Sequence, residues 1–171
     1  MKSIQIFKLE ETAKIPSFAT QEAACFDIYA NIVPQNYVIY NHISDKIFDF
    51  ELVNIDGKKS VIVPANGRAL IPTGIILDIP KGYSVRIHPR SGNALKRGIS
   101  LTNSEGIIDS DYTDELYVMI QNMNDVDIAI SHHDRIAQGE LVKSLEYTIE
   151  ETQTHPQQKG NRRGGFGSTG V

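Results

Sequence analysis

Apolar and polar positions fall into many short runs rich in Val, Ile, Tyr and Phe, and turn residues separate many of these runs. Runs of this length and composition are typical of β-strands. The pattern predicts strands at residues 3–8, 37–41, 47–53, 60–63, 69–77, 83–88, 115–121 and 139–147.

Turn residues mark the connections between these runs. The Asp56-Gly57 pair predicts a hairpin, and residues 64–67 and 80–82 predict loops. No segment keeps a 3.6-residue apolar period, and only residues 92–97 could form a short helix, with Ser91 as a possible N-cap. The pattern therefore predicts an all-β fold with one short helix, closed as a barrel or sandwich.

Composition narrows the class of protein. A chain of 171 residues fits one compact domain, and a net charge of −4 gives no basic surface for duplex nucleic acid. Cys25 is the only cysteine, which excludes an internal disulfide and a cysteine-based zinc site. The first residues lack a signal-peptide pattern and no apolar run reaches the length of a membrane span, so a cytoplasmic location is expected, in a host cell if the source is a virus.

The last 21 residues differ from the rest. Residues 152–159 are polar, and Arg162 and Arg163 precede a glycine-rich end that includes Phe166. Glycines let backbone N–H groups approach an anion, arginines add charge, and an aromatic ring can stack on a base. These features favour a flexible nucleotide-binding arm, and the alternative is a terminus that is only disordered and glycine-rich.

Residues 106–112 place Asp109, Asp111 and Tyr112 after an apolar pair. In a hairpin the two carboxylates would share a face and Tyr112 would lie opposite. A carboxylate beside Ile108 can act as a general base toward water, and a tyrosine ring can lie against a sugar. The alternative is a polar turn capped by aspartate side chains.

Three other positions could carry chemistry or bind ions. Arg90 and Ser91 stand where a strand enters the short helix and could clamp a phosphate, although basic helical turns are also common on plain surfaces. Asp27 is either a buried structural aspartate or a ligand of Mg²⁺ through water. The adjacent His132-His133 pair would point to opposite faces of a strand, so these histidines are interpreted as loop residues.

Taken in order, these segments resemble the five motifs of the trimeric deoxyuridine triphosphatases (dUTPases). The motifs correspond to residues 24–28, 89–92, 106–112, 134–138 and 164–170. The resemblance covers nearly the whole chain except roughly residues 37–59. It implies a jelly-roll-like β-barrel, a homotrimer with shared active sites, and Mg²⁺-assisted hydrolysis of dUTP to dUMP and pyrophosphate. This reaction limits uracil incorporation into DNA and supplies dUMP for thymidylate synthesis.

The resemblance also implies roles for individual residues. Asp109 would deprotonate the water that attacks the α-phosphorus, Tyr112 would pack on the deoxyribose, and Asp27 would hold a magnesium-bound water. Uracil would be read by Asn103 and by the backbone around Ile107 and Ile108. The triphosphate and the base would also be bound by Arg90, Ser91, Gly92, Gln138, Arg162, Arg163, Phe166, Gly167, Ser168 and Thr169.

The resemblance divides the chain into a β domain at residues 1–150 and an arm at residues 151–171 that completes a neighbouring active site. The insertion at about residues 37–59 is either an extra hairpin or a docking surface for a regulatory partner. Cys25, Asp114 and His133 replace usual glycines, and Asn161 stands where the family has an arginine, so Arg162 or Arg163 would substitute. Two alternatives are dCTP deaminase, which shares the fold, and a regulatory protein that binds a partner in its nucleotide-bound state.

Overall fold

The computed structural model describes residues 2–33, 38–41, 46–49 and 52–161. These residues form fifteen strands and one short helix, and every strand pairing between them is antiparallel. The strands are β1 (Gln5–Lys8), β2 (Ser17–Phe18), β3 (Phe26–Tyr29), β4 (Val38–Asn41), β5 (Lys46–Asp49), β6 (Val53–Ile55), β7 (Lys58–Val63), β8 (Arg68–Pro72), β9 (Ile75–Asp78), β10 (Tyr83–His88), β11 (Ile99–Leu101), β12 (Gly106–Ile108), β13 (Tyr117–Asn122), β14 (Ile128–Ser131) and β15 (Arg135–Lys143), and the helix is α1 (Ser91–Arg97).

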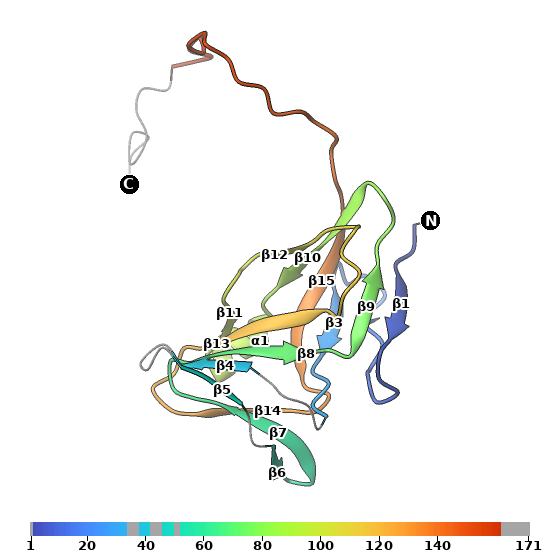
Figure 1. Cartoon of the computed structure of the whole chain (residues 1–171), viewed down its shortest axis with the longest axis vertical. Helices are drawn as coiled ribbons and strands as arrows, with labels where there is room; N and C mark the ends of the chain where they lie inside the picture. The colour runs from blue at the N-terminus through green and yellow to red at the C-terminus, as the bar shows by residue number, and fades with distance from the viewer. Residues whose placement is uncertain (1, 34–37, 42–45, 50–51, 162–171) are drawn as a thin grey trace.

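Two five-stranded sheets make up most of the body (Figure 1). Their strand orders are β12-β10-β15-β3-β2 and β11-β13-β8-β4-β5, and smaller sheets join β14-β7-β6 and β1-β9. The core between them is rich in fully buried isoleucines, among them Ile28, Ile71 and Ile120. Burying each such side chain stabilises the fold by about 2 to 3 kcal/mol. The all-β prediction with one short helix is therefore confirmed.

The helix prediction is confirmed, but its cap is wrong. α1 begins at Ser91, and the N-cap position is Arg90, which has extended backbone and makes no side-chain cap hydrogen bond. The helix ends at Gly98, whose left-handed φ of 58° stops the helical repeat. Arg90 is thus left with its side chain free for another partner.

The single strand predicted at residues 69–77 is wrong, because the structure divides it into β8 and β9. Gly74 has a φ of +67°, which breaks the extended backbone between them. A side chain here would also clash, since a Cβ at Gly74 would lie 2.5 Å from Nδ2 of Asn31. Tertiary packing at this glycine overrides the continuous apolar run.

The strand predicted at residues 139–147 is wrong at both ends, since β15 runs from Arg135 to Lys143. Residues 144–161 are exposed and leave the body as a segment without helix or strand (Figure 1). Sequence reasoning also missed β3, whose four residues are all buried and so lack the apolar-polar alternation of a half-exposed strand.

The insertion contributes strands to both a large and a small sheet. The run predicted at 47–53 comprises β5 and the start of β6, and residues 50–51 lie outside the described part of the chain. β4 pairs with both β5 and β8, and β6 pairs with β7. The hairpin predicted at Asp56-Gly57 is confirmed, with positive φ at both residues as its tight turn requires. A docking role for this insertion stays a prediction.

Two smaller expectations concern histidine and membranes. His132 and His133 lie in the turn between β14 and β15, which confirms them as loop residues. Within the described ranges, no helix has the length and apolar character needed to span a membrane.

Candidate active site

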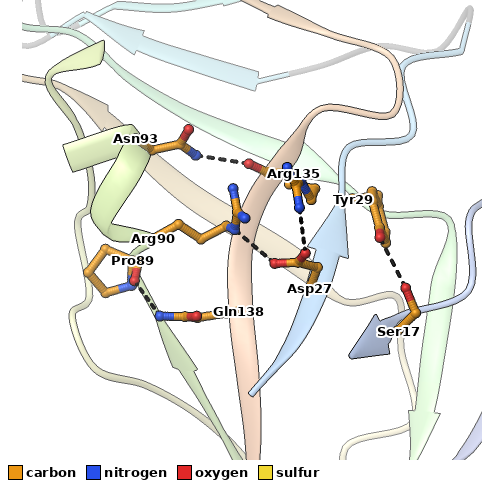
Figure 2. A network of polar contacts seen from close by, with 8 residues as sticks. All are labelled: Ser17, Asp27, Tyr29, Pro89, Arg90, Asn93, Arg135 and Gln138. Atoms are coloured by element: carbon orange, nitrogen blue, oxygen red, sulfur yellow. Dashed lines mark hydrogen bonds and ion pairs between the residues drawn. The ribbon is translucent and has the colours of Figure 1, made fainter. Parts of the chain in front are cut away.

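Polar side chains from β3, β15 and the start of α1 meet around Asp27 (Figure 2). Asp27 is only 6% exposed. Nε of Arg90 donates to its Oδ1 at 2.8 Å, and Nη1 of Arg135 donates to its Oδ2 at 3.2 Å. A carboxylate that is nearly buried needs such partners, because an unpaired buried charge is strongly destabilising. Asp27 is thus buried and hydrogen-bonded to two arginines, as the structural alternative expects, and its binding of Mg²⁺ stays a prediction.

An irregularity in β15 places Arg135 in this cluster. Gln138 pairs with Asp27 and Arg135 pairs with Tyr29, so the register shifts by one residue between Arg135 and Ala137. Residues three apart on a regular strand point to opposite faces, and a β-bulge removes that difference. The consecutive buried residues Ile136 and Ala137 mark the bulge. Arg135 and Gln138 therefore share the face that carries Asp27.

The segment before and inside α1 is fastened to β15 at two points. Nε2 of Gln138 donates to the carbonyl of Pro89 at 3.0 Å, and Nδ2 of Asn93 donates to the carbonyl of Arg135 at 2.9 Å (Figure 2). Between these points Ser91 and Gly92 are exposed, and the space beside Gly92 is open. The structure thus brings the predicted residues Asp27, Arg90, Ser91, Gly92 and Gln138 together. We call these five residues the Asp27 set.

A second set of predicted residues lies along β12. This strand is the edge of its sheet, so alternate backbone N–H and C=O groups face away from β10. Gly106 lies opposite Ile87, and a Cβ there would be 3.1 Å from Nδ2 of Asn103. Ile107 is 53% exposed. The strand edge and the Asn103 amide form a polar margin that could pair with the edge of a flat ring.

The residues after β12 form a turn. The backbone N–H of Tyr112 donates to the carbonyl of Asp109 at 3.2 Å, so Asp109 and Asp111 do not alternate along a strand and the expected shared face is wrong. Both carboxylates are exposed. The Tyr112 hydroxyl donates to the carbonyl of Glu115 at 2.9 Å, which fixes its ring. We call Asn103, Ile107, Ile108, Asp109 and Tyr112 the β12 set.

Partial burial raises the pKa of Tyr112, and the nearby carboxylates of Asp114 and Glu115 raise it further. The phenol therefore keeps its proton at neutral pH and donates its hydrogen bond. Glu115 also accepts from the backbone N–H of Gly74 at 2.7 Å, which ties this turn to the break between β8 and β9.

The Asp27 set and the β12 set lie apart in one chain. β12 runs antiparallel to β10, with Ile108 opposite Val85 and Gly106 opposite Ile87. Asp109 therefore extends beyond Val85, whereas Arg90 extends beyond the other end of β10. At about 3.3 Å per residue, the extended chain from Val85 to Arg90 alone spans about 17 Å. Within one subunit, Asp109 and Arg90 therefore lie toward opposite ends of β10.

The predicted residues of the arm, Arg162, Arg163, Phe166, Gly167, Ser168 and Thr169, lie outside the described residues. Sequence reasoning gave no role to Arg135 or Asn93. Arg135 stood within the fourth motif, but a three-residue spacing from Gln138 predicts opposite faces on a regular strand. Only the bulge reveals that both face Asp27.

The carboxylate of Asp27 suits a metal ion whose other ligands supply most of its contacts. No cluster of three or more His, Cys, Asp or Glu side chains suited to a metal occurs in the part of the chain that the structure describes. Each oxygen of Asp27 accepts one arginine hydrogen bond and retains a second lone pair. Mg²⁺ keeps several waters and often binds chiefly to phosphates, so the residues fit an ion held through water.

Comparison with known proteins places this geometry in context. The family model described as dUTPase matches residues 50–170. A deoxyuridine 5'-triphosphate nucleotidohydrolase of Brucella melitensis is 42% identical over 123 residues, covering 72% of this chain and 77% of the relative. The protein of the same name from Syntrophotalea carbinolica is 34% identical over 168 residues, covering 98% and 97%.

Solved structures share the fold at lower identity. The dUTPase of Staphylococcus bacteriophage 80alpha, solved with dUpNHpp, matches with a TM-score of 0.76 at 20% identity and full coverage of both chains. A dUTPase from phage phi11 of S. aureus matches with a TM-score of 0.68 at 18% identity, covering 90% of this chain and 98% of the other.

Proposed function

The chain belongs to the dUTPase family and is a dUTP diphosphatase, and from this premise we propose an active site that is shared between subunits. Each site would combine the β12 set of one subunit with the Asp27 set of another. The separation of Asp109 from Arg90 within one chain supports this arrangement. A general base must lie within hydrogen-bond reach of the attacking water, and the arginine must contact the same triphosphate. Two subunits of a homotrimer can satisfy both conditions, because a cyclic assembly juxtaposes different surfaces of neighbouring chains.

In the proposed reaction Asp109 takes a proton from water. The water oxygen attacks the α-phosphorus, the bond from that phosphorus to the bridging oxygen breaks, and pyrophosphate leaves with the bonding electrons. The products are dUMP and pyrophosphate. Arg90, Ser91, Gly92 and Gln138 hold the phosphates in line, since phosphoryl transfer mainly requires positioning and charge stabilisation.

The β12 set selects the nucleotide. The free edge of β12 and the Asn103 amide would pair with the uracil edge, so the amino group of cytosine would meet the wrong partners. The ring of Tyr112, held through its hydroxyl by Glu115, would pack on the deoxyribose and exclude a 2′-hydroxyl. Each mismatch leaves a polar group unpaired or forces a steric clash.

Mg²⁺ would be held by the triphosphate and, through a water, by Asp27. When bound, the ion neutralises charge on the phosphate oxygens and draws electron density away from the phosphorus. The protein residues supply the remaining contacts, and Asp27 also remains the partner of Arg90 and Arg135.

The segment that follows β15 supports an arm that reaches a neighbouring subunit. Leu145, Tyr147 and Ile149 are 78%, 80% and 91% exposed, and polar residues alternate with them. This period of two is that of a strand with one apolar face. A neighbour could cover that face and direct residues 162–171 to an active site, where Phe166 would stack on uracil and Ser168 and Thr169 would contact the terminal phosphates.

A product assay tests the activity. We expect pyrophosphate release from dUTP in the presence of Mg²⁺, and far slower release from dCTP, dTTP and UTP. Ammonia release from dCTP would instead indicate the deaminase alternative. No pyrophosphate from dUTP would contradict the proposed function.

A further inference from the structure

Arg90 contacts Asp27 through Nε alone, at 2.8 Å, although arginine and carboxylate often form two parallel hydrogen bonds. The second carboxylate oxygen is taken by Nη1 of Arg135 at 3.2 Å (Figure 2). We propose that Arg135 is a positioning residue: by holding Oδ2 of Asp27, it fixes the orientation of the carboxylate and keeps the terminal nitrogens of Arg90 available for the phosphate chain. This inference rests on the proposed role of Arg90 in phosphate binding.

Removing Arg135 would leave Oδ2 of Asp27 without its arginine donor. The side chains of Asp27 and Arg90 are 9% and 22% exposed, whereas that of Arg135 is 50% exposed, so Arg90 would compete for Oδ2 with the water that replaces Arg135. The carboxylate would then gain most by rotating to take Arg90 through two nitrogens, because paired hydrogen bonds satisfy both oxygens. Arg90 would turn at least one terminal nitrogen toward Asp27 and away from substrate.

The backbone holds Arg135 in place for this role. Its carbonyl accepts from Asn93 at 2.9 Å, and the bulge at Ile136 directs its side chain to the Asp27 face. The same hydrogen bond joins Arg135 to α1, which follows Arg90 directly. Arg90 and Arg135 are thus linked both through Asp27 and through the backbone of the short helix.

The competing interpretation is that Arg135 binds phosphate itself, because its side chain is 50% exposed. A double-mutant cycle separates the two. The variants are Arg90→Ala, Arg135→Ala, the double variant and Arg135→Lys, each in the full chain. The probe is a non-hydrolysable imido analogue of dUTP, whose dissociation constant is measured with Mg²⁺ by calorimetry.

Arg135→Ala should weaken analogue binding about tenfold, the loss expected for one charge-assisted hydrogen bond. In the Arg90→Ala background the same change should weaken binding less than about twofold, because its effect passes through Arg90. Arg135→Lys should restore most of the affinity, since a cation again faces Oδ2. Lys58→Ala, at the exposed start of β7, removes the same charge and should leave affinity unchanged.

A spectroscopic measurement follows Arg90 directly. The ¹⁵N resonance of its Nε–H group, assigned by its loss in Arg90→Ala, should shift in Arg135→Ala and return toward the wild-type position in Arg135→Lys. Thermal unfolding of each variant shows whether the fold is intact. A change caused only by lost stability would not depend on Arg90.

Equal effects of Arg135→Ala with and without Arg90 would overturn the inference and identify Arg135 as a direct ligand. Unchanged affinity in Arg135→Ala would overturn it as well. The wild-type protein separates these outcomes from failure of the proposed function: if it releases pyrophosphate from dUTP and Arg90→Ala weakens binding, only the role of Arg135 is contradicted.

Discussion

Asp27 and Asp109 carry the same side chain in opposite surroundings. Asp27 is nearly buried and its two oxygens accept from Arg90 and Arg135, whereas Asp109 is exposed on a turn at the end of an edge strand. A carboxylate whose two oxygens accept from arginines is held in place, whereas an accessible carboxylate can bind a water molecule. Their surroundings therefore fit a positioning role for Asp27 and the proposed role of general base for Asp109.

Asp109→Asn should lower the turnover number for dUTP by at least about 100-fold, because a general base contributes that much or more. Affinity for the imido analogue should change little, since the amide has nearly the same shape. Asp111→Asn is the matched control, as Asp111 is exposed on the same turn. Retained turnover in Asp109→Asn would exclude this residue as the base.

Arg162 or Arg163 is expected to replace the arginine absent at Asn161. If Arg163 makes this contact, Arg163→Ala should lower kcat/KM for dUTP about tenfold, the loss of one charge-assisted phosphate contact. Arg162→Ala, measured alongside by pyrophosphate release, should have a smaller effect. An active Arg163→Ala variant would assign the contact to Arg162 or to neither.

At the scale of elements, sequence pattern was reliable where one face of a strand is buried and one exposed. β10 matches its predicted bounds, 83–88, and β13 alternates between buried and exposed residues. Pattern was unreliable where packing sets the backbone, as at Gly74, or where a bulge changes the facing of a strand, as at Ile136. The sequence motifs indicated the residues of the Asp27 set, but not the bulge that brings Arg135 beside them.

The turn before β15 makes fold stability depend on pH. Nδ1 of His132 accepts from the backbone N–H of Ile32 at 3.0 Å, and the His132 and His133 rings lie 3.7 Å apart. Burial lowers the pKa of His132 from 6.5, and His133 and Lys59 lower it further. As pH falls below 6.5, the unfolded chain binds a proton at this site before the folded chain does, so the free energy of unfolding decreases until the folded pKa is passed.

His132→Asn keeps an acceptor for Ile32 but cannot be protonated. Urea unfolding between pH 7.5 and pH 5.5 should therefore show a smaller loss of stability in this variant than in the wild type. His155→Asn alters an exposed histidine outside the body and should behave as the wild type does. An equal acid loss in His132→Asn would show that other groups govern the pH dependence.

The arm segment should hold the subunits together through its apolar face. Tyr147→Asp places a charge on that face, and the trimer dissociation constant should rise at least about tenfold because the tyrosine would no longer be buried. Thr148→Asp adds the same charge to the alternate face and should be tolerated. Sedimentation velocity across a concentration series measures both, and an equally stable Tyr147→Asp trimer would contradict a role for this face.

At the scale of the whole molecule, the fold places the β12 set and the Asp27 set toward opposite ends of the β10–β12 pair. A cyclic trimer can bring one end of a subunit to the other end of its neighbour, so that three identical sites form from three incomplete ones. The extended segment after β15 (Figure 1) would, in the proposed assembly, bring a third contribution to each site.

Subunit complementation tests this arrangement most directly. Asp109→Asn and Arg90→Ala chains are each expected to be nearly inactive alone. When the two are co-expressed in equal amounts and purified as mixed trimers, one of the three sites in each trimer should combine an intact Asp109 with an intact Arg90 from its neighbour. Pyrophosphate release from dUTP should then recover to about a third of the wild-type rate. No recovery in verified mixed trimers would contradict a site shared between subunits.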